Sequence, residues 1–248
     1  MTIIVSLRFS PFFFRTTLLS KKKRKKIFMI TAHTTEILDV LAIAKEHDYE
    51  TILAESEKFE PMDVNSLVTI LITHYHNNTR GNIICIYDLA QKVSVKHSYM
   101  HPELSKLTEA LFLFFDDLLF HLKKEEQILF PNIIRLMKKA AVVEASTYTK
   151  FGLVKELVLF MQKENYAIIR KLMVLRELTN NYMIPGDACS YYRSLFERMK
   201  EFEKCLLLYI HLENDNLFPK AIHMEEGFTK HFIKRKLETN SMFLKKTY

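Results

Sequence analysis

Two segments of the sequence place a carboxylate where it could bind a metal. They read HLKKEEQILFP (121–131) and YIHLENDNLFP (209–219), and they share a Glu at the fifth position and a Leu-Phe-Pro ending. The resulting pairs are His121 with Glu125 and Tyr209 with Glu213. Residues four apart lie on one face of a helix, so each pair can act on a common ligand. A metal ion is one such ligand, and a plain His-Glu hydrogen bond is the alternative for the first pair.

Both pairs lie on helix faces that are otherwise apolar. The first face also carries Phe114, Leu118, Ile128 and Leu129, and the second carries Phe202, Leu206 and Leu217. An imidazole or a carboxylate on such a face is costly to bury unless something pairs with it. The sequence therefore predicts a buried polar cluster that needs a partner.

Two further segments interrupt an apolar stripe with polar residues. Asn165 is the one polar residue on the line of Met161, Ile168 and Leu172. The stretch THYHNNTRGN (73–82) places His76 or His74 on the inner face of another helix. Polar residues in the core of a bundle reduce its stability, which indicates a site. Carboxylate-bridged di-iron centres are built in this way, with inward polar residues from each of four helices.

The elements that must position these residues are long helices. The 248 residues include only 4 Gly, 6 Pro and no Trp, a composition with few turn-forming residues. We predict an all-α fold, an antiparallel four-helix bundle. Its helices are expected at about 63–93, 105–140, 150–182 and 188–222, with a cap at Asp63 or Asn65, interruptions at Pro131 and Pro219, and a loop that contains His97.

Composition divides the chain into four parts. Residues 1–30 are expected to be a disordered basic tail, or translated sequence ahead of a start at Met29; an organellar presequence or a membrane-surface anchor is the other interpretation. Residues 31–60 are expected to form short helices, 61–224 the bundle, and 225–248 a C-terminal tail.

The charge distribution argues against a nucleic-acid-binding body. Residues 1–30 hold eight of the 36 basic residues and no acidic residue, which leaves 28 Lys and Arg against 29 Asp and Glu elsewhere. The three cysteines form no C-x-x-C pair, so neither a disulfide framework nor a thiolate zinc site is indicated. No apolar run reaches the length of a membrane-spanning helix. We expect a cytoplasmic protein with no nucleic-acid partner and no membrane contact by its body.

The ordered set of motifs resembles the RIC (repair of iron centres) family of hemerythrin-like proteins over residues 36–222. The motifs are YHNNTR (75–80), VKH (95–97), HLKKEEQILFP (121–131), NNYMIPGDAC (180–189) and HLENDNLFP (211–219). The resemblance implies two non-haem irons held by helix histidines, a loop histidine and two bridging glutamates. Carried over by motif, the metal ligands are His76, the loop residue His97, His121, Glu125 and Glu213.

Two positions differ from the family pattern, because Asn165 and Tyr209 stand where family members have histidine. Three outcomes are open. Tyr209 could ligate as a phenolate, with the Asn165 carbonyl as a weak oxygen ligand. One iron could remain on His121, Glu125, His97 and Glu213. Alternatively the cluster binds no metal, and protonation or neighbouring lysines stabilise its carboxylates. The Cys-Cys segment that precedes the bundle in family members is also missing.

The resemblance implies a function in iron metabolism. We expect a protein that serves the repair of iron-sulfur clusters damaged by nitrosative or oxidative stress, as an iron donor and not as a conventional enzyme with catalytic residues. Its partners would be damaged iron-sulfur proteins or cluster-assembly proteins, with a homodimer left open. The alternatives are an oxygen-binding or nitric oxide-sensing module, and a metal-free bundle retained for protein interaction.

Overall fold

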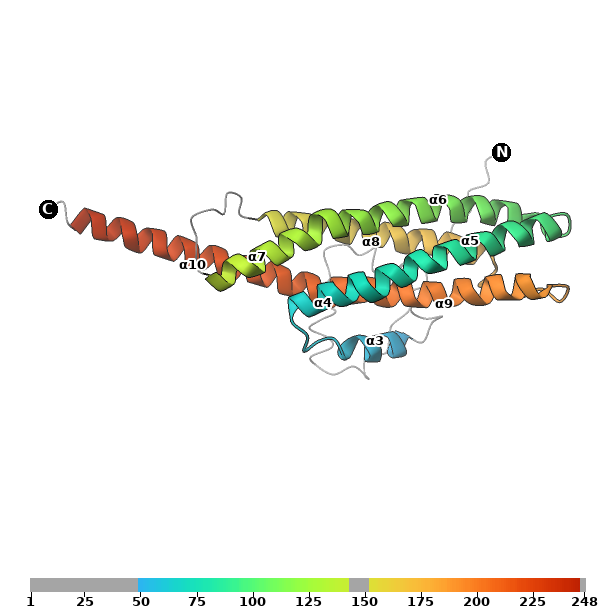
Figure 1. Ribbon diagram of the computed structural model, residues 1–248, viewed down its shortest axis with the longest axis horizontal. Helices are drawn as coiled ribbons and strands as arrows, with labels where there is room; N and C mark the ends of the chain where they lie inside the picture. Colours follow the sequence, from blue (N-terminus) through green and yellow to red (C-terminus); the bar gives the residue numbers. More distant parts are fainter. Residues whose placement is uncertain (1–48, 143–151, 246–248) are drawn as a thin grey trace, which may run out of the picture.

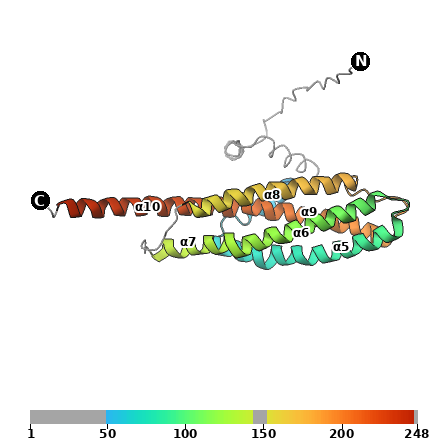
Figure 2. The same ribbon diagram turned by 90° about the horizontal axis from the view of Figure 1, so that it is seen from above.

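The computed structural model describes residues 49–142 and 152–245, and within these ranges the chain is helical and contains no strand. The predicted all-α class is confirmed. After α3 (Tyr49–Glu57), four rods form an antiparallel bundle (Figures 1 and 2). The rods are α4 (Val64–Ile70), η1 (Leu71–His76) and α5 (Asn77–His97); α6 (Glu103–Lys124), η2 (Glu125–Leu129) and α7 (Phe130–Val142); α8 (Leu153–Leu178); and α9 (Ser190–Leu212), η4 (Glu213–Leu217) and α10 (Phe218–Lys245).

The start of the first rod is set by a side-chain cap. Asp63 has an extended backbone and its carboxylate accepts a hydrogen bond from the Ser66 backbone N–H, which satisfies one of the free donors of the first turn. The rod ends at His97 and not near Val93, so His97 lies in the last turn of α5 and not in a loop. The predicted C-terminal tail continues as helix α10 to Lys245. Of the short helices predicted over 31–60, α3 is described, and residues 31–48 lie outside the described ranges.

Three of the four rods contain a π-helical turn at mid-length. In η2 and η4 the backbone N–H groups of Phe130 and Phe218 bond to the carbonyls of Glu125 and Glu213, five residues back. A proline follows one residue later in each rod, and its ring cannot be placed against the carbonyl four residues earlier in a regular helix. The wider turn lets each rod pass its proline without a break, so both predicted interruptions are local widenings of a continuous helix.

The π turn also changes which side chains face the core. Ile128 was expected on the buried face and is 46 % exposed, whereas Leu129 and Phe130 are buried. Each π turn holds an extra residue, so the regular phase of 100° per residue fails across it. The rest of the core follows the α-helical pattern, with buried apolar side chains from all four rods, among them Ile86, Leu118, Ile133, Val158, Leu172, Leu195, Leu206 and Leu217.

A buried ion pair fixes the connection between α8 and α9. Arg176 Nε lies 2.6 Å from Glu203 Oε1, and the Tyr182 hydroxyl donates to the other oxygen of Glu203. Three successive residues, 180–182, have positive φ, a conformation that non-glycine residues rarely adopt, so this turn depends on its side-chain contacts. Thr179 adds one, since its hydroxyl accepts the Tyr182 N–H.

Replacement of Glu203 by Leu is predicted to destabilise the protein by about 3–5 kcal/mol, because it leaves the buried Arg176 charge without its carboxylate. Urea unfolding followed by far-ultraviolet circular dichroism measures this loss. Lys92→Ala, which breaks the exposed pair between Lys92 and Asp88 on α5, is the control and should leave the midpoint unchanged. A Glu203→Leu protein as stable as the wild type would contradict the structural role of the pair.

Candidate metal centre

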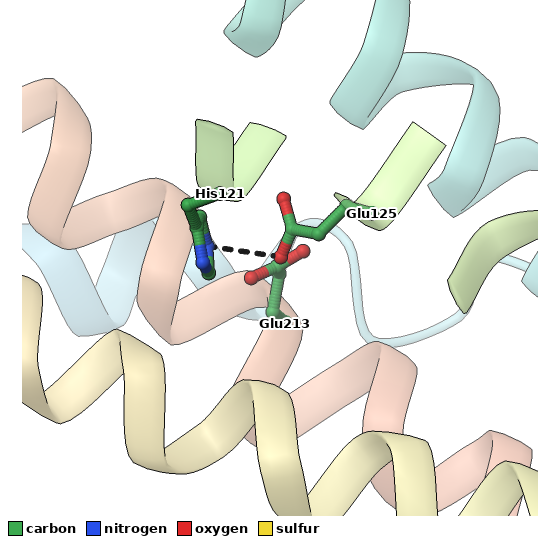
Figure 3. A group of neighbouring side chains, drawn as sticks. All are labelled: His121, Glu125 and Glu213. Atoms are coloured by element: carbon green, nitrogen blue, oxygen red, sulfur yellow. Dashed lines mark ion pairs between the residues drawn. The ribbon is translucent and has the colours of Figure 1, made fainter. Parts of the chain in front are cut away.

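Six of the seven predicted site residues meet at the level of the π turns. His76, His121, Glu125, Asn165, Tyr209 and Glu213 are each at most 2 % exposed, and they come from all four rods. His76 ends η1, Glu125 begins η2 and Glu213 begins η4, so the widened turns adjoin the cluster. Figure 3 shows His121, Glu125 and Glu213 directed toward one another between the second and fourth rods. His74, the other candidate of the first rod, is exposed.

The carboxylate of Glu125 lies between two imidazoles. Its Oε1 is 3.1 Å from Nε2 of His121, and its Oε2 is 3.4 Å from Nε2 of His76. Each oxygen thus faces a histidine from a different rod. A carboxylate in this position can bridge two cations, one beside each histidine.

Each histidine is oriented by a carboxylate on its outer side. His76 Nδ1 donates to Glu126 Oε1 at 2.7 Å, and His121 Nδ1 donates to Glu164 Oε2 at 3.0 Å. Arg80 bonds to Glu126 and Lys124 bonds to Glu164, so a cation supports each carboxylate. With Nδ1 engaged, Nε2 of both rings is directed into the cluster. Metal-binding histidines are commonly oriented through this arrangement.

The two departures from the family pattern bond to the glutamates. The Tyr209 hydroxyl donates to Oε2 of Glu125, the oxygen that faces His76. The Asn165 amide Nδ2 donates to Oε2 of Glu213 at 3.0 Å. The Tyr209 and His76 rings also pack edge to face, with centroids 5.4 Å apart. Both residues therefore occupy the positions of the missing imidazoles and satisfy one oxygen of each carboxylate.

Five buried polar atoms in the cluster have no hydrogen-bond partner. They are His76 Nε2, His121 Nε2, Glu125 Oε1, Asn165 Oδ1 and Glu213 Oε1, of which His121 Nε2 and Glu125 Oε1 face each other as an ion pair at 3.1 Å. Buried polar atoms are nearly always satisfied, because each unpaired one costs free energy. Convergent nitrogen and carboxylate donors of this kind suit iron and similar divalent metals. The residues present thus fit a metal ion, and a cation would satisfy the donors that the protein leaves unpaired.

The pKa shifts of the cluster also fit a bound cation. Burial raises the pKa of Glu213 well above its usual value, and the neighbouring negative charge of Glu125 raises it further. Burial lowers the pKa of His121, but the charge of Glu125 and the contacts with Glu125 and Glu164 outweigh it and raise the pKa to about 9. Without a metal, protons on these two groups compensate the buried carboxylates. A bound cation would take over that role and displace the protons.

His97 does not reach this cluster. It is 21 residues beyond His76 on the same rod, which is about 30 Å along a helix axis. Its Nε2 instead lies 3.1 Å from Cys189 Sγ, at the end of the bundle where α9 begins. The ligand set carried over from the family therefore cannot include His97 in one centre with the other residues, because a helix does not fold back on itself.

Sequence reasoning missed the four residues behind the histidines, namely Arg80, Glu126, Lys124 and Glu164. Three of the four lie beside a selected residue, since Glu126 and Lys124 adjoin Glu125 and Glu164 adjoins Asn165; Arg80 lies four residues after His76. Their polar neighbours on a mostly apolar helix were the available signal. Which of them faces a histidine depends on how the rods pack, and the sequence does not give that.

Replacement of Glu126 or Glu164 by Gln is predicted to weaken binding of Fe²⁺ by about 10–100-fold, because each change removes the charge that orients one histidine. Anaerobic titration with Fe²⁺ measures the affinity. Glu109→Gln on the outer face of α6 is the control, since Glu109 is exposed and outside the cluster. Unchanged affinity in both cluster variants would show that these carboxylates do not support metal ligands.

Comparison with known proteins agrees with this geometry. Residues 68–221 match the hemerythrin HHE cation binding domain. The chain is 31% identical over 170 residues, 68% of its own length and 71% of the relative's, to the iron-sulfur cluster repair protein YtfE of Yersinia pseudotuberculosis serotype IB (strain PB1/+). The same identity and coverage hold for the YtfE protein of Yersinia pestis (strain Pestoides F). The chain therefore belongs to the hemerythrin-like RIC family.

Proposed function

We propose that this protein binds non-haem iron and serves the repair of iron-sulfur clusters damaged by nitrosative or oxidative stress. The observation that carries the proposal is the set of five buried, convergent nitrogen and oxygen atoms that make no hydrogen bond, in a chain that shares 31% identity with iron-sulfur cluster repair proteins. We assign His76, His121, Glu125 and Glu213 as metal ligands, with Tyr209 and Asn165 beside them as weaker oxygen donors.

The residues of the centre hold iron in a site that excludes bulk water. Glu125 places one oxygen toward each histidine, and Glu126 and Glu164 keep the two imidazoles in register. Iron bound there would supply a redox-active ion that a damaged cluster lacks. Because Glu213 and His121 carry protons when the centre is empty of cations, uptake of iron releases protons and its loss restores them. No pair of groups arranged for hydrolysis is needed for such a role.

The targets and location follow from the same proposal. Damaged iron-sulfur proteins are the partners we expect, with cluster-assembly proteins as a second group, and we place the protein in the cytoplasm. None of the described helices is long and apolar enough to cross a membrane. A homodimer remains part of the proposal and is tested by the mass of the protein in solution.

A sensing function is the second candidate. The donor atoms are almost fully buried, which favours an iron that stays bound and responds to oxygen or nitric oxide. A sensor must keep its iron bound, whereas an iron donor must release it. The repair experiment below separates them, because a sensor keeps its iron while the damaged enzyme stays inactive.

The test is reactivation of a [4Fe–4S] hydro-lyase inactivated by nitric oxide. The iron-loaded protein is expected to restore hydro-lyase activity anaerobically, and Glu125→Gln should lose most of this effect, because it removes the charge between the two histidines. Lys92→Ala is the control and should repair as the wild type does. Restoration by the same concentration of free Fe²⁺ alone, or by Glu125→Gln at the wild-type rate, would contradict the proposal. Retained iron without reactivation would favour the sensor.

A further inference from the structure

Glu125 divides the metal centre into two halves. The His121 half consists of His121, Oε1 of Glu125, Glu213 and Asn165; the His76 half consists of His76, Oε2 of Glu125 and Tyr209. The two histidines are held in the same way, each by an outer carboxylate and a cation. Any difference between the halves therefore comes from the oxygen donors and not from the imidazoles.

The His121 half is arranged as a set of metal ligands. His121, Glu125 and Glu213 each offer one atom, and these atoms all lie within 4.8 Å of one another. In residues 49–142 and 152–245 this is the one group of three His, Cys, Asp or Glu side chains that meets this distance. Four of the five unpartnered atoms are His121 Nε2, Glu125 Oε1, Glu213 Oε1 and Asn165 Oδ1, all in this half. One imidazole, two carboxylates and an amide oxygen make a suitable set for iron.

The His76 half offers less. Its one unpartnered atom is Nε2 of His76. The glutamate oxygen that faces this nitrogen already accepts a hydrogen bond from the Tyr209 hydroxyl, and the Tyr209 and His76 rings pack edge to face. His76, Glu125 and Glu213 do not form such a close group, so the ligand set of the His76 half is less complete.

We propose that the two halves bind iron with unequal affinity: the His121 half retains one iron, and the His76 half holds a second iron that leaves first. The inference depends on the iron binding proposed above and is independent of the repair activity. It assigns the transferable iron of this protein to the half beside Tyr209, and it assigns a retained iron to the half beside Asn165. The inequality arises from residues of this chain that differ from the family pattern.

The experiment is stepwise removal of iron. Protein loaded anaerobically with Fe²⁺ is dialysed against increasing concentrations of a ferrous chelator such as ferrozine, and iron per chain is measured at each concentration. We expect release in two steps. The iron retained by the His121 half should leave at a chelator concentration at least about tenfold higher than the iron of the His76 half, a factor within the range by which the surroundings of a metal change its affinity. His76→Ala should lose only the early step and His121→Ala the late step. Tyr209→His should move the early step toward the late one.

His76→Ala and His121→Ala form a matched pair, because each removes one imidazole that is held by an outer carboxylate and a cation. Circular dichroism checks that each remains helical, and the wild-type release curve tests the proposal without any variant. A single iron bound at saturation overturns the proposal, because the His76 half then holds no second iron. Release of two irons in one step overturns the inference of unequal affinity. Loss of the late step in both variants overturns it as well. Both results leave the proposed function intact. A wild-type protein that binds no iron overturns both proposals.

Discussion

A carboxylate held between two imidazoles in a water-excluding core is the constraint on which this structure depends. Glu125 is fully buried, and its charge requires positive partners within a few ångströms. The partners extend outward on both sides as a chain of alternating charge, which runs from Lys124 through Glu164 and His121 to Glu125, and on through His76 and Glu126 to Arg80. The buried charge is thus linked to both surfaces of the bundle. A metal ion at the centre would continue this alternation.

The rods are shaped to bring these groups to one level. Glu125 and Glu213 each begin a π turn that ends at the Leu of a Leu-Phe-Pro sequence, so the same local geometry directs a carboxylate inward in two distant segments. A regular helix at these points would meet the proline ring. The widened turns resolve that clash, and they occur where the site is, as π turns in helices often do. The departures from regular helix geometry therefore occur at the positions of the proposed ligands.

Asn165 and Tyr209 give the centre its particular character. Each donates a hydrogen bond to one glutamate, which compensates part of the buried charge without a metal. A histidine at either position would offer an additional nitrogen donor. These two residues therefore favour a centre that tolerates partial occupancy, with the His121 half closer to a complete ligand set. The resulting asymmetry has a plain origin in the hydrogen-bonding chemistry of amide and phenol groups.

The sequence by itself determined the all-α bundle, the approximate rods and six of the buried polar residues. Helical spacing and apolar faces report burial directly, so His121, Glu125, Asn165, Tyr209 and Glu213 could be found without coordinates, and His76 within a choice of two. The exposure of Ile128 could not be predicted in this way, because a π turn adds a residue that regular spacing ignores. Only the tertiary structure decided that His97 lies at the far end of the bundle beside Cys189, and that Glu126 and Glu164 support the two histidines. Those facts depend on how far each helix runs and on which rods pack side by side, and contacts between distant segments are not encoded in local periodicity.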